Sequence, residues 1–85
     1  MFDKTMTFSV GDERDREIRV ILNTVYNALK EKGYNPINQL VGYILSEDPT
    51  YITTNQNARS LIRKLDRDEL LRALVEDFIR LEQKG

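Results

Sequence analysis

Apolar residues recur at three- and four-residue spacing through most of the chain, and this period predicts α-helices. A first amphipathic helix is expected from Glu13 to about Lys32, with acidic residues in its first turns and lysines near its end. Its inward positions are predicted to be Ile18, Ile21, Leu22, Val25, Ala28 and Leu29, with Tyr26 at the margin. The pattern therefore predicts a core helix in the first half of the chain.

A tight helix-turn-helix corner is predicted next, and the rest of the chain is organised around it. Gly33 can take the left-handed conformation that ends a helix, Asn35 can cap the following one, and Pro36 suits a first helical position. The second helix ends before Asp48-Pro49, because the residue before proline is pushed out of the helical region. Its predicted apolar stripe comprises Ile37, Leu40, Val41, Ile44 and Leu45.

The second half of the chain predicts two further helices. Tyr51 and Ile52 are expected to anchor a polar loop, in which several residues offer caps for a third helix: Thr53, Thr54, Asn55 and Asn57. This helix should turn Ala58, Leu61, Ile62 and Leu65 inward. Asp66 and Glu69 have the capping-box spacing and predict a new helix from Arg67 to about Gln83. Its expected inward residues are Leu70, Leu71, Leu74, Val75, Phe78 and Ile79.

The first eleven residues differ from the rest. Between Thr5 and Val10 polar and apolar side chains alternate, which is typical of extended chain. Gly11 is expected to end this stretch and Asp12 to cap the first helix. Residues 1–11 are therefore predicted to be a flexible N-terminal arm of an all-α fold with four to five helices.

Length and composition limit what the chain can do. Its 85 residues predict one domain, residues 1–85, which buries only roughly 60 to 65% of its unfolded surface. A homodimer that shares one core is therefore expected. The chain contains no Cys and no His, which excludes disulfides, thiolate chemistry and imidazole bases, and argues against most zinc sites. We expect no enzymatic activity, no cofactor and no metal; the N-terminus does not resemble a signal peptide, and a cytoplasmic protein without membrane insertion is expected.

Gly42 is an unusual choice inside a helix, where glycine costs about 1 kcal/mol relative to alanine. It forms a row of small residues with Asn38 and Ser46 at four-residue spacing. The row predicts that a crossing helix, from the same chain or from a second subunit, approaches the backbone at Gly42.

Basic residues gather at one place only. The sequence has 13 basic and 14 acidic residues, so no net field favours nucleic acid, and residues 33–57 contain no Lys or Arg beside the helix-turn-helix. The cluster comprises Arg59, Arg63, Lys64 and Arg67. Such a stripe is usually solvated and paired with nearby carboxylates; the alternative is an interaction face for an acidic, phosphorylated or nucleic-acid partner.

Several segments carry a family resemblance. They are Asp3-Lys4-Thr5-Met6 with Phe8, Lys32 to Gln39, Val41-Gly42-Tyr43, Asp48-Pro49 with Tyr51-Ile52, Asn57-Ala58-Arg59, Leu61 to Leu65, and Arg67 to Leu70. Through them the chain resembles the IreB (YrzL-type) family of small regulators from Gram-positive bacteria. The resemblance implies an all-helical, non-catalytic homodimer in the cytoplasm.

The resemblance also implies a regulatory role. It implies that the chain is phosphorylated by a transmembrane Ser/Thr kinase with PASTA domains and dephosphorylated by the cognate phosphatase. This signalling is linked to cell-wall stress and cephalosporin resistance. The match places the phosphoacceptor on Thr5, with Thr7 as a further candidate at a position that is usually basic in the family. An unknown downstream protein is the expected partner, and a nucleic-acid-binding protein that uses the Arg59–Arg67 face is the alternative.

Overall fold

The computed structural model describes the backbone of residues 4–84 and the side chains of residues 13–80. Within this range all regular structure is helical, which confirms the predicted all-α class. The elements are α1 (Lys4–Glu31), α2 (Pro36–Ser46), α3 (Ala58–Ile62) and α4 (Arg67–Lys84), with the 3-10 helices η1 (Pro49–Tyr51) and η2 (Asn55–Asn57) between α2 and α3.

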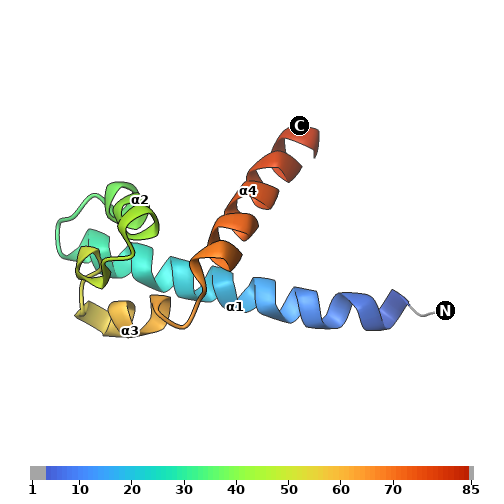
Figure 1. Cartoon of the computed structure of the whole chain (residues 1–85), viewed down its shortest axis with the longest axis horizontal. Coiled ribbons are helices and arrows are strands. Elements are labelled where there is room, and N and C mark those ends of the chain that lie inside the picture. Colours follow the sequence, from blue (N-terminus) through green and yellow to red (C-terminus); the bar gives the residue numbers. More distant parts are fainter. Residues whose placement is uncertain (1–3, 85) are drawn as a thin grey trace.

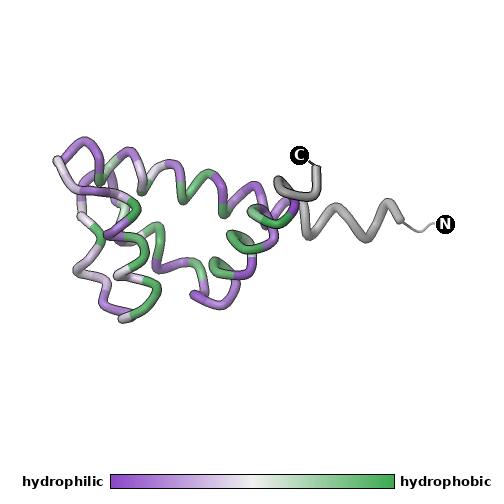
Figure 2. The backbone as a smooth tube through the Cα atoms, turned by 90° about the horizontal axis from the view of Figure 1, so that it is seen from above, coloured by the Kyte–Doolittle hydropathy of each residue, from purple (hydrophilic) through white to green (hydrophobic). Residues whose placement is uncertain are grey.

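The long helix α1 is the axis of the molecule (Figure 1). Helices α2 and α3 lie on opposite sides of its C-terminal half, and α4 rises steeply from its middle (Figure 1). Along α1 and α4, hydrophobic and hydrophilic segments alternate in the tube, as expected for amphipathic helices (Figure 2). Three helices thus form one body, and α4 projects from it.

The N-terminal segment differs from the predicted extended arm. The backbone of α1 is helical from Lys4, so Thr5 and Thr7 lie in its first turns and Gly11 lies inside the helix. An alternation over six residues is a weak signal, no proline interrupts residues 4–31, and an internal glycine costs only about 1 kcal/mol. Residues 1–3 of the predicted arm lie outside the described range.

The predicted corner between α1 and α2 is confirmed in detail. Gly33 has φ +87°, and the N–H groups of Gly33 and Tyr34 donate to the carbonyls of Lys30 and Leu29 at 3.0 Å each. Asn35 is extended and its side chain accepts from the N–H of Asn38 at 3.1 Å, with Pro36 as the first helical residue. Each residue therefore has the role that its chemistry predicts.

The core lies where α1 meets α2 and α3. The inward stripes predicted for α1 and α3 are confirmed, except that Leu22 and Leu61 are half-buried at the edge of the core. The buried residues are Ile18, Ile21, Val25, Ala28, Leu29, Tyr43, Ile52, Ala58, Ile62, Leu65 and Leu70. Ile52 anchors its loop as predicted, because its side chain is fully buried.

The inward faces predicted for α2 and α4 are wrong for the single chain. In α2, Leu40 and Ile44 pack against the core and Tyr43 is buried, while three predicted inward residues are exposed: Ile37, Val41 and Leu45. In α4, as far as Arg80, only Leu70 is buried, and the other five predicted inward residues are exposed. The apolar stripes exist, but no other helix covers them among the side chains that the structure describes.

The connection from η2 to α3 holds an unpredicted backbone conformation. Gln56 and Asn57 both have left-handed backbones, with φ of 54° and 61°. The Glu31 carboxylate accepts from the side-chain amides of Asn55 and Gln56 at 2.7 and 2.8 Å, and these bonds lower the pKa of Glu31. The end of α1 therefore fixes the turn that starts α3.

Candidate functional site

An apolar groove lies between α1, α2 and α4. It encloses about 250 Å³, and its lining is apolar apart from one amide and one phenol group: Leu22, Asn23, Tyr26, Ile37, Leu40, Val41, Ile44 and Leu74. Helix α1 forms its floor, α2 one wall and Leu74 of α4 the other. A concave apolar surface of this kind is suited to receive apolar side chains of another protein.

Helix α4 continues the apolar surface beyond the groove. Leu71 and Phe78 lie three residues before and four residues after Leu74, so they share its side of the helix. Phe78 is 67% exposed and Leu71 49%. Val75 and Ile79 widen the stripe and are half exposed. Exposed large apolar residues on one helix, next to an apolar groove, mark an interaction surface.

The close approach predicted at Gly42 is present, but its neighbour is an aromatic ring and not a crossing helix. A Cβ atom on Gly42 would lie 2.5 Å from Cε1 of Tyr51, a residue of η1. The Gln39 side chain also donates to the carbonyl of Tyr51 at 2.9 Å. Gly42 therefore provides the space in which η1 packs against α2, and the row with Asn38 and Ser46 is no helix-packing surface within this chain.

The basic residues of the Arg59–Arg67 cluster do not form one free face. Arg59 is half-buried and its Nε donates to the carbonyl of Ile52 at 2.8 Å. Arg67 donates from Nη1 to the carbonyl of Ile44 at 2.6 Å and forms an ion pair with Glu47. Two of the four basic side chains thus fix the backbone of the η1 segment and of α2.

The two remaining basic residues, Arg63 and Lys64, are exposed in the turn that follows α3. Two exposed charges supply fewer phosphate contacts than the full cluster was predicted to offer. Amide side chains near the start of α2 are of a type that can pair with adenine, but two of them are engaged elsewhere: Asn35 caps α2, and Gln39 donates to the carbonyl of Tyr51. The structure therefore adds no observation that favours nucleic acid.

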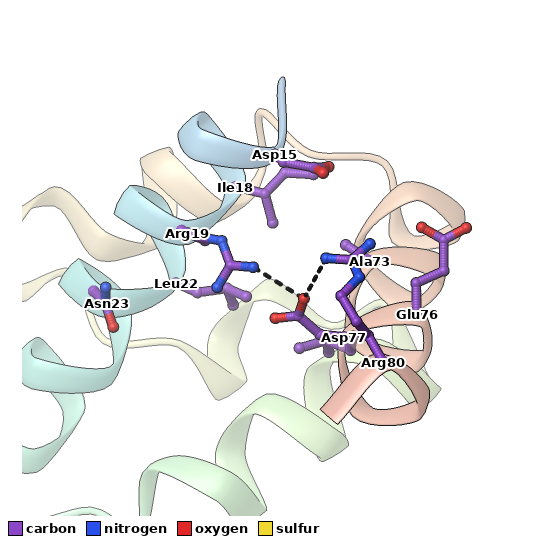
Figure 3. Close-up of a pocket in the computed structure, with 10 residues that line it drawn as sticks. Asp15, Ile18, Arg19, Leu22, Asn23, Ala73, Glu76, Asp77 and Arg80 are labelled. Carbon is purple, nitrogen blue, oxygen red and sulfur yellow. Dashed lines mark hydrogen bonds and ion pairs between the residues drawn. The ribbon is translucent and has the colours of Figure 1, made fainter. Parts of the chain in front are cut away.

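Ion pairs between charged side chains link α1 to α4. Arg14 binds both carboxylate oxygens of Glu69, with Nη2 at 2.6 Å from Oε1, and also Glu17 at 2.7 Å. Five residues further along α1, Arg19 binds Asp77 at 2.9 Å (Figure 3). The hydrogen bonds from Arg14 lower the pKa of Glu69, because they stabilise the ionised carboxylate.

The acidic pairs near the turns have structural roles. The Asp48 carboxylate accepts from the N–H and hydroxyl of Thr50 at 3.0 and 2.7 Å, and these bonds lower its pKa. Glu69 accepts from the N–H of Asp66 at 3.4 Å, as in a capping box. Among the described residues, no three acidic side chains are grouped as a metal site would require.

The predicted phosphoacceptors, Thr5 and Thr7, lie in the first turns of α1, at its end away from α2 and α3 (Figure 1). Their side chains lie outside the described range. In residues 4–84, no helix is both long enough and apolar enough to cross a bilayer. The candidate sites are thus the start of α1 and the groove with α4, which lie on different parts of the molecule.

Sequence reasoning missed three features of this surface. It did not assign the ring of Tyr51 to Gly42, the burial of Tyr43, or the ion pairs between α1 and α4. Only the last had a local signal, because Arg14 and Arg19 stand out among the acidic residues at the start of α1. Their partners are 55 and 58 residues away, beyond the reach of periodicity.

A comparison with protein families identifies a match over most of the chain. The family model described as IreB regulatory phosphoprotein matches residues 3–80. The match includes the start of α1, the corner, the groove and the described part of α4. It therefore covers both candidate sites in one alignment.

Proposed function

The chain belongs to the IreB regulatory phosphoprotein family, and from this membership we propose that it is a non-catalytic cytoplasmic protein controlled by phosphorylation near its N-terminus. The family match carries the proposal, because it includes Thr5 and Thr7. The composition supports it, since a chain without His and Cys has neither an imidazole base, the most common catalytic base, nor a thiol nucleophile.

The proposed modifying enzyme is a transmembrane PASTA-type Ser/Thr kinase, opposed by its cognate phosphatase, in signalling linked to cell-wall stress and cephalosporin resistance. Thr5 is the proposed main acceptor and Thr7 a minor one. A kinase binds its substrate as an extended segment, so the first turns of α1 must unwind in the complex. This unwinding costs little at a helix terminus, because helix ends fray.

Phosphorylation of Thr5 would change the charge at the start of α1. It adds about −1.5 to −2 charges at pH 7 and three strong acceptor oxygens. The described core begins at Ile18, thirteen residues further along α1, so no core contact has to change. The proposed switch therefore alters the surface read by a downstream protein and leaves the helical body intact.

Peptide mass mapping after incubation with the kinase and ATP tests this assignment. We expect the main modification on Thr5, its loss in Thr5→Ala, and little change in Thr7→Ala. Ser9→Ala is the matched control, because Ser9 is a third hydroxyl residue in the same segment. Undiminished labelling of Thr5→Ala would reject Thr5 as the acceptor. A loss of helical circular dichroism on phosphorylation would reject the intact body.

We propose in addition that the chain is a homodimer, with the groove and the exposed faces of α2 and α4 at its interface. Eight large apolar residues on these two helices are 40 to 78% exposed. With about 200 Å² for each full residue surface, they expose roughly 900 Å², and each partner contributes about 800 Å² to a standard interface. They are Ile37, Val41, Leu45, Leu71, Leu74, Val75, Phe78 and Ile79.

Sedimentation equilibrium at micromolar concentration tests the dimer. The wild-type chain should have twice the monomer mass of 10.0 kDa. Phe78→Glu should yield monomers, because it places a charge in the apolar interface while the exposed position tolerates it in the single chain. Val20→Glu is the control, since Val20 is 62% exposed but does not line the groove. A monomeric wild-type chain would reject the proposal.

The downstream partner is proposed to be a protein that prefers one phosphorylation state. A pull-down with unmodified and Thr5-phosphorylated protein, compared by mass spectrometry, should identify it. Proteins retained equally by both forms would argue against phosphorylation as the control.

A further inference from the structure

The inclination of α4 is weakly determined by packing. Among the described residues of α4 only Leu70, in the first turn, is buried, and Ala73 is half-buried. All other apolar side chains of the helix from Leu71 to Ile79 are at least 40% exposed. A helix held by the core only at Leu70 and Ala73 can pivot about this end, because no described residue of α4 further along packs against the core.

One ion pair joins α4 to α1 at this pivot, and a second joins the two helices about two turns further along α4. The first joins Arg14 to Glu69 through two hydrogen bonds, and the second joins Arg19 to Asp77 at 2.9 Å. Arg80 lies 3.5 Å from the same Asp77 oxygen and points to it from the next turn (Figure 3). Glu69 and Asp77 are eight residues apart, which is about 12 Å along a helix. Two attachments this far apart fix a direction, whereas one would leave a pivot.

The direction of α4 determines the shape of the groove. Leu74 forms the wall opposite α2, and it lies between Glu69 and Asp77 in the sequence. Movement of α4 away from α1 would widen the groove and change the angle between the apolar faces of α2 and α4. A second copy that covers both faces at once needs them at one fixed angle, because interfaces are packed as closely as protein cores.

We propose that the Arg14–Glu69 and Arg19–Asp77 ion pairs act as positioning contacts for self-association, by holding α4 at the inclination at which a second copy can cover α2 and α4 together. This inference rests on the proposed homodimer. The ion pairs themselves are partly exposed and add little to the stability of the single chain. Their effect appears in the dimer, because a free α4 must be ordered each time that two chains associate.

The dissociation constant of the dimer, measured by sedimentation, tests the proposal with four variants. Glu69→Gln removes the charge but keeps a residue that suits the capping box, so the start of α4 is preserved. We expect it to raise the dissociation constant about twofold to fivefold, since the loss of an exposed ion pair changes an equilibrium constant by up to about fivefold. Arg14→Glu should raise it at least as much, because two carboxylates then face each other.

The reversed pair, Arg14→Glu with Glu69→Arg, is the decisive variant. It should recover most of the affinity that Arg14→Glu alone loses. Both proteins carry the same change at position 14, so effects within α1, including the loss of the Glu17 contact, cancel in the comparison. Arg16→Glu is the control, since Arg16 lies in the same helix, is exposed and forms no ion pair with any described residue.

The outcomes separate the two proposals. A dimeric wild-type chain whose affinity is unchanged in Glu69→Gln and Arg14→Glu would overturn the positioning role and leave the homodimer in place. Failure of the reversed pair to recover affinity would likewise overturn it, because the charges would then not act on each other. A wild-type chain that stays monomeric would overturn the homodimer and the positioning role together.

Discussion

The Tyr51 ring packs against Gly42, and we therefore expect Gly42→Ala to destabilise the wild-type chain but to stabilise a chain that lacks this ring. A Cβ atom at position 42 would lie 2.5, 2.7 and 2.9 Å from three atoms of the Tyr51 ring, so Gly42→Ala must displace the ring. The ring is 39% exposed and can swing outward. Exposing about 100 Å² of it costs about 2.5 kcal/mol at 25 cal/mol per Å², and alanine returns about 1 kcal/mol of helix propensity. We expect a net loss of about 1 to 1.5 kcal/mol of unfolding free energy.

Removing the ring reverses the expected sign. In a Tyr51→Ala background, Gly42→Ala should stabilise the protein by about 1 kcal/mol, since only the helix propensity remains. The bond from Gln39 to the Tyr51 carbonyl is kept, because it involves the backbone. Urea unfolding of the wild type, the two single variants and the double variant, all at one protein concentration, gives the coupling free energy between positions 42 and 51, which we expect to be near 2 kcal/mol.

Asn38→Ala provides the control for this cycle, because Asn38 lies in the same helix and its side chain is exposed. Its effect should be the same with and without the Tyr51 ring. Stabilisation by Gly42→Ala in both backgrounds would refute the reasoning, since it would mean that the ring does not occupy the space above Gly42.

Three further predictions concern single contacts, each measured by urea or thermal unfolding. Asn35→Ala should lower the unfolding free energy by about 1 kcal/mol, because it removes the cap of α2. Arg67→Ala should cost about 1 to 2 kcal/mol through the lost bond to the Ile44 carbonyl, while Arg63→Ala should stay within about 0.5 kcal/mol; equal effects would contradict the different roles of the two arginines. Because the pKa of Glu69 is lowered in the folded chain, ionised Glu69 adds to the unfolding free energy above its ordinary pKa of 4.5, and this contribution is lost as the pH falls below that value. Glu69→Gln should therefore lose less stability than the wild-type chain between pH 5 and pH 3.

The local features of the fold could be predicted from the sequence, since each depends on neighbouring residues. The corner needs only Gly33, Asn35 and Pro36, and the capping box needs Asp66 and Glu69. The same holds for the phase break between α3 and α4. The start of α1 could not be predicted, because alternation over six residues competes with a helix that needs no special signal to continue backward.

The candidate site was predicted less well, because its chemistry depends on residues far apart in the chain. Arg59 and Arg67 belong to a regular basic stripe in the sequence, yet each bonds a backbone carbonyl that ends an earlier segment. A charge pattern shows which side of a helix is basic, but not whether its side chains reach solvent. Only the contacts of α3 and α4 with the η1 segment and α2 decide that.

The exposed stripes of α2 and α4 show what helical periodicity measures. The same period predicts the buried side of α1 correctly and that of α4 incorrectly, although Leu71, Val75 and Phe78 repeat as regularly as Ile18, Ile21 and Val25. The difference is that α2 and α3 cover α1 from two sides, whereas no described residue of α4 beyond Ala73 packs against the core. Periodicity identifies the apolar side of a helix, but it does not show whether the same chain or another molecule covers that side. In the proposed homodimer a second copy would cover the exposed stripe of α4, and the measured stability would then depend on the protein concentration.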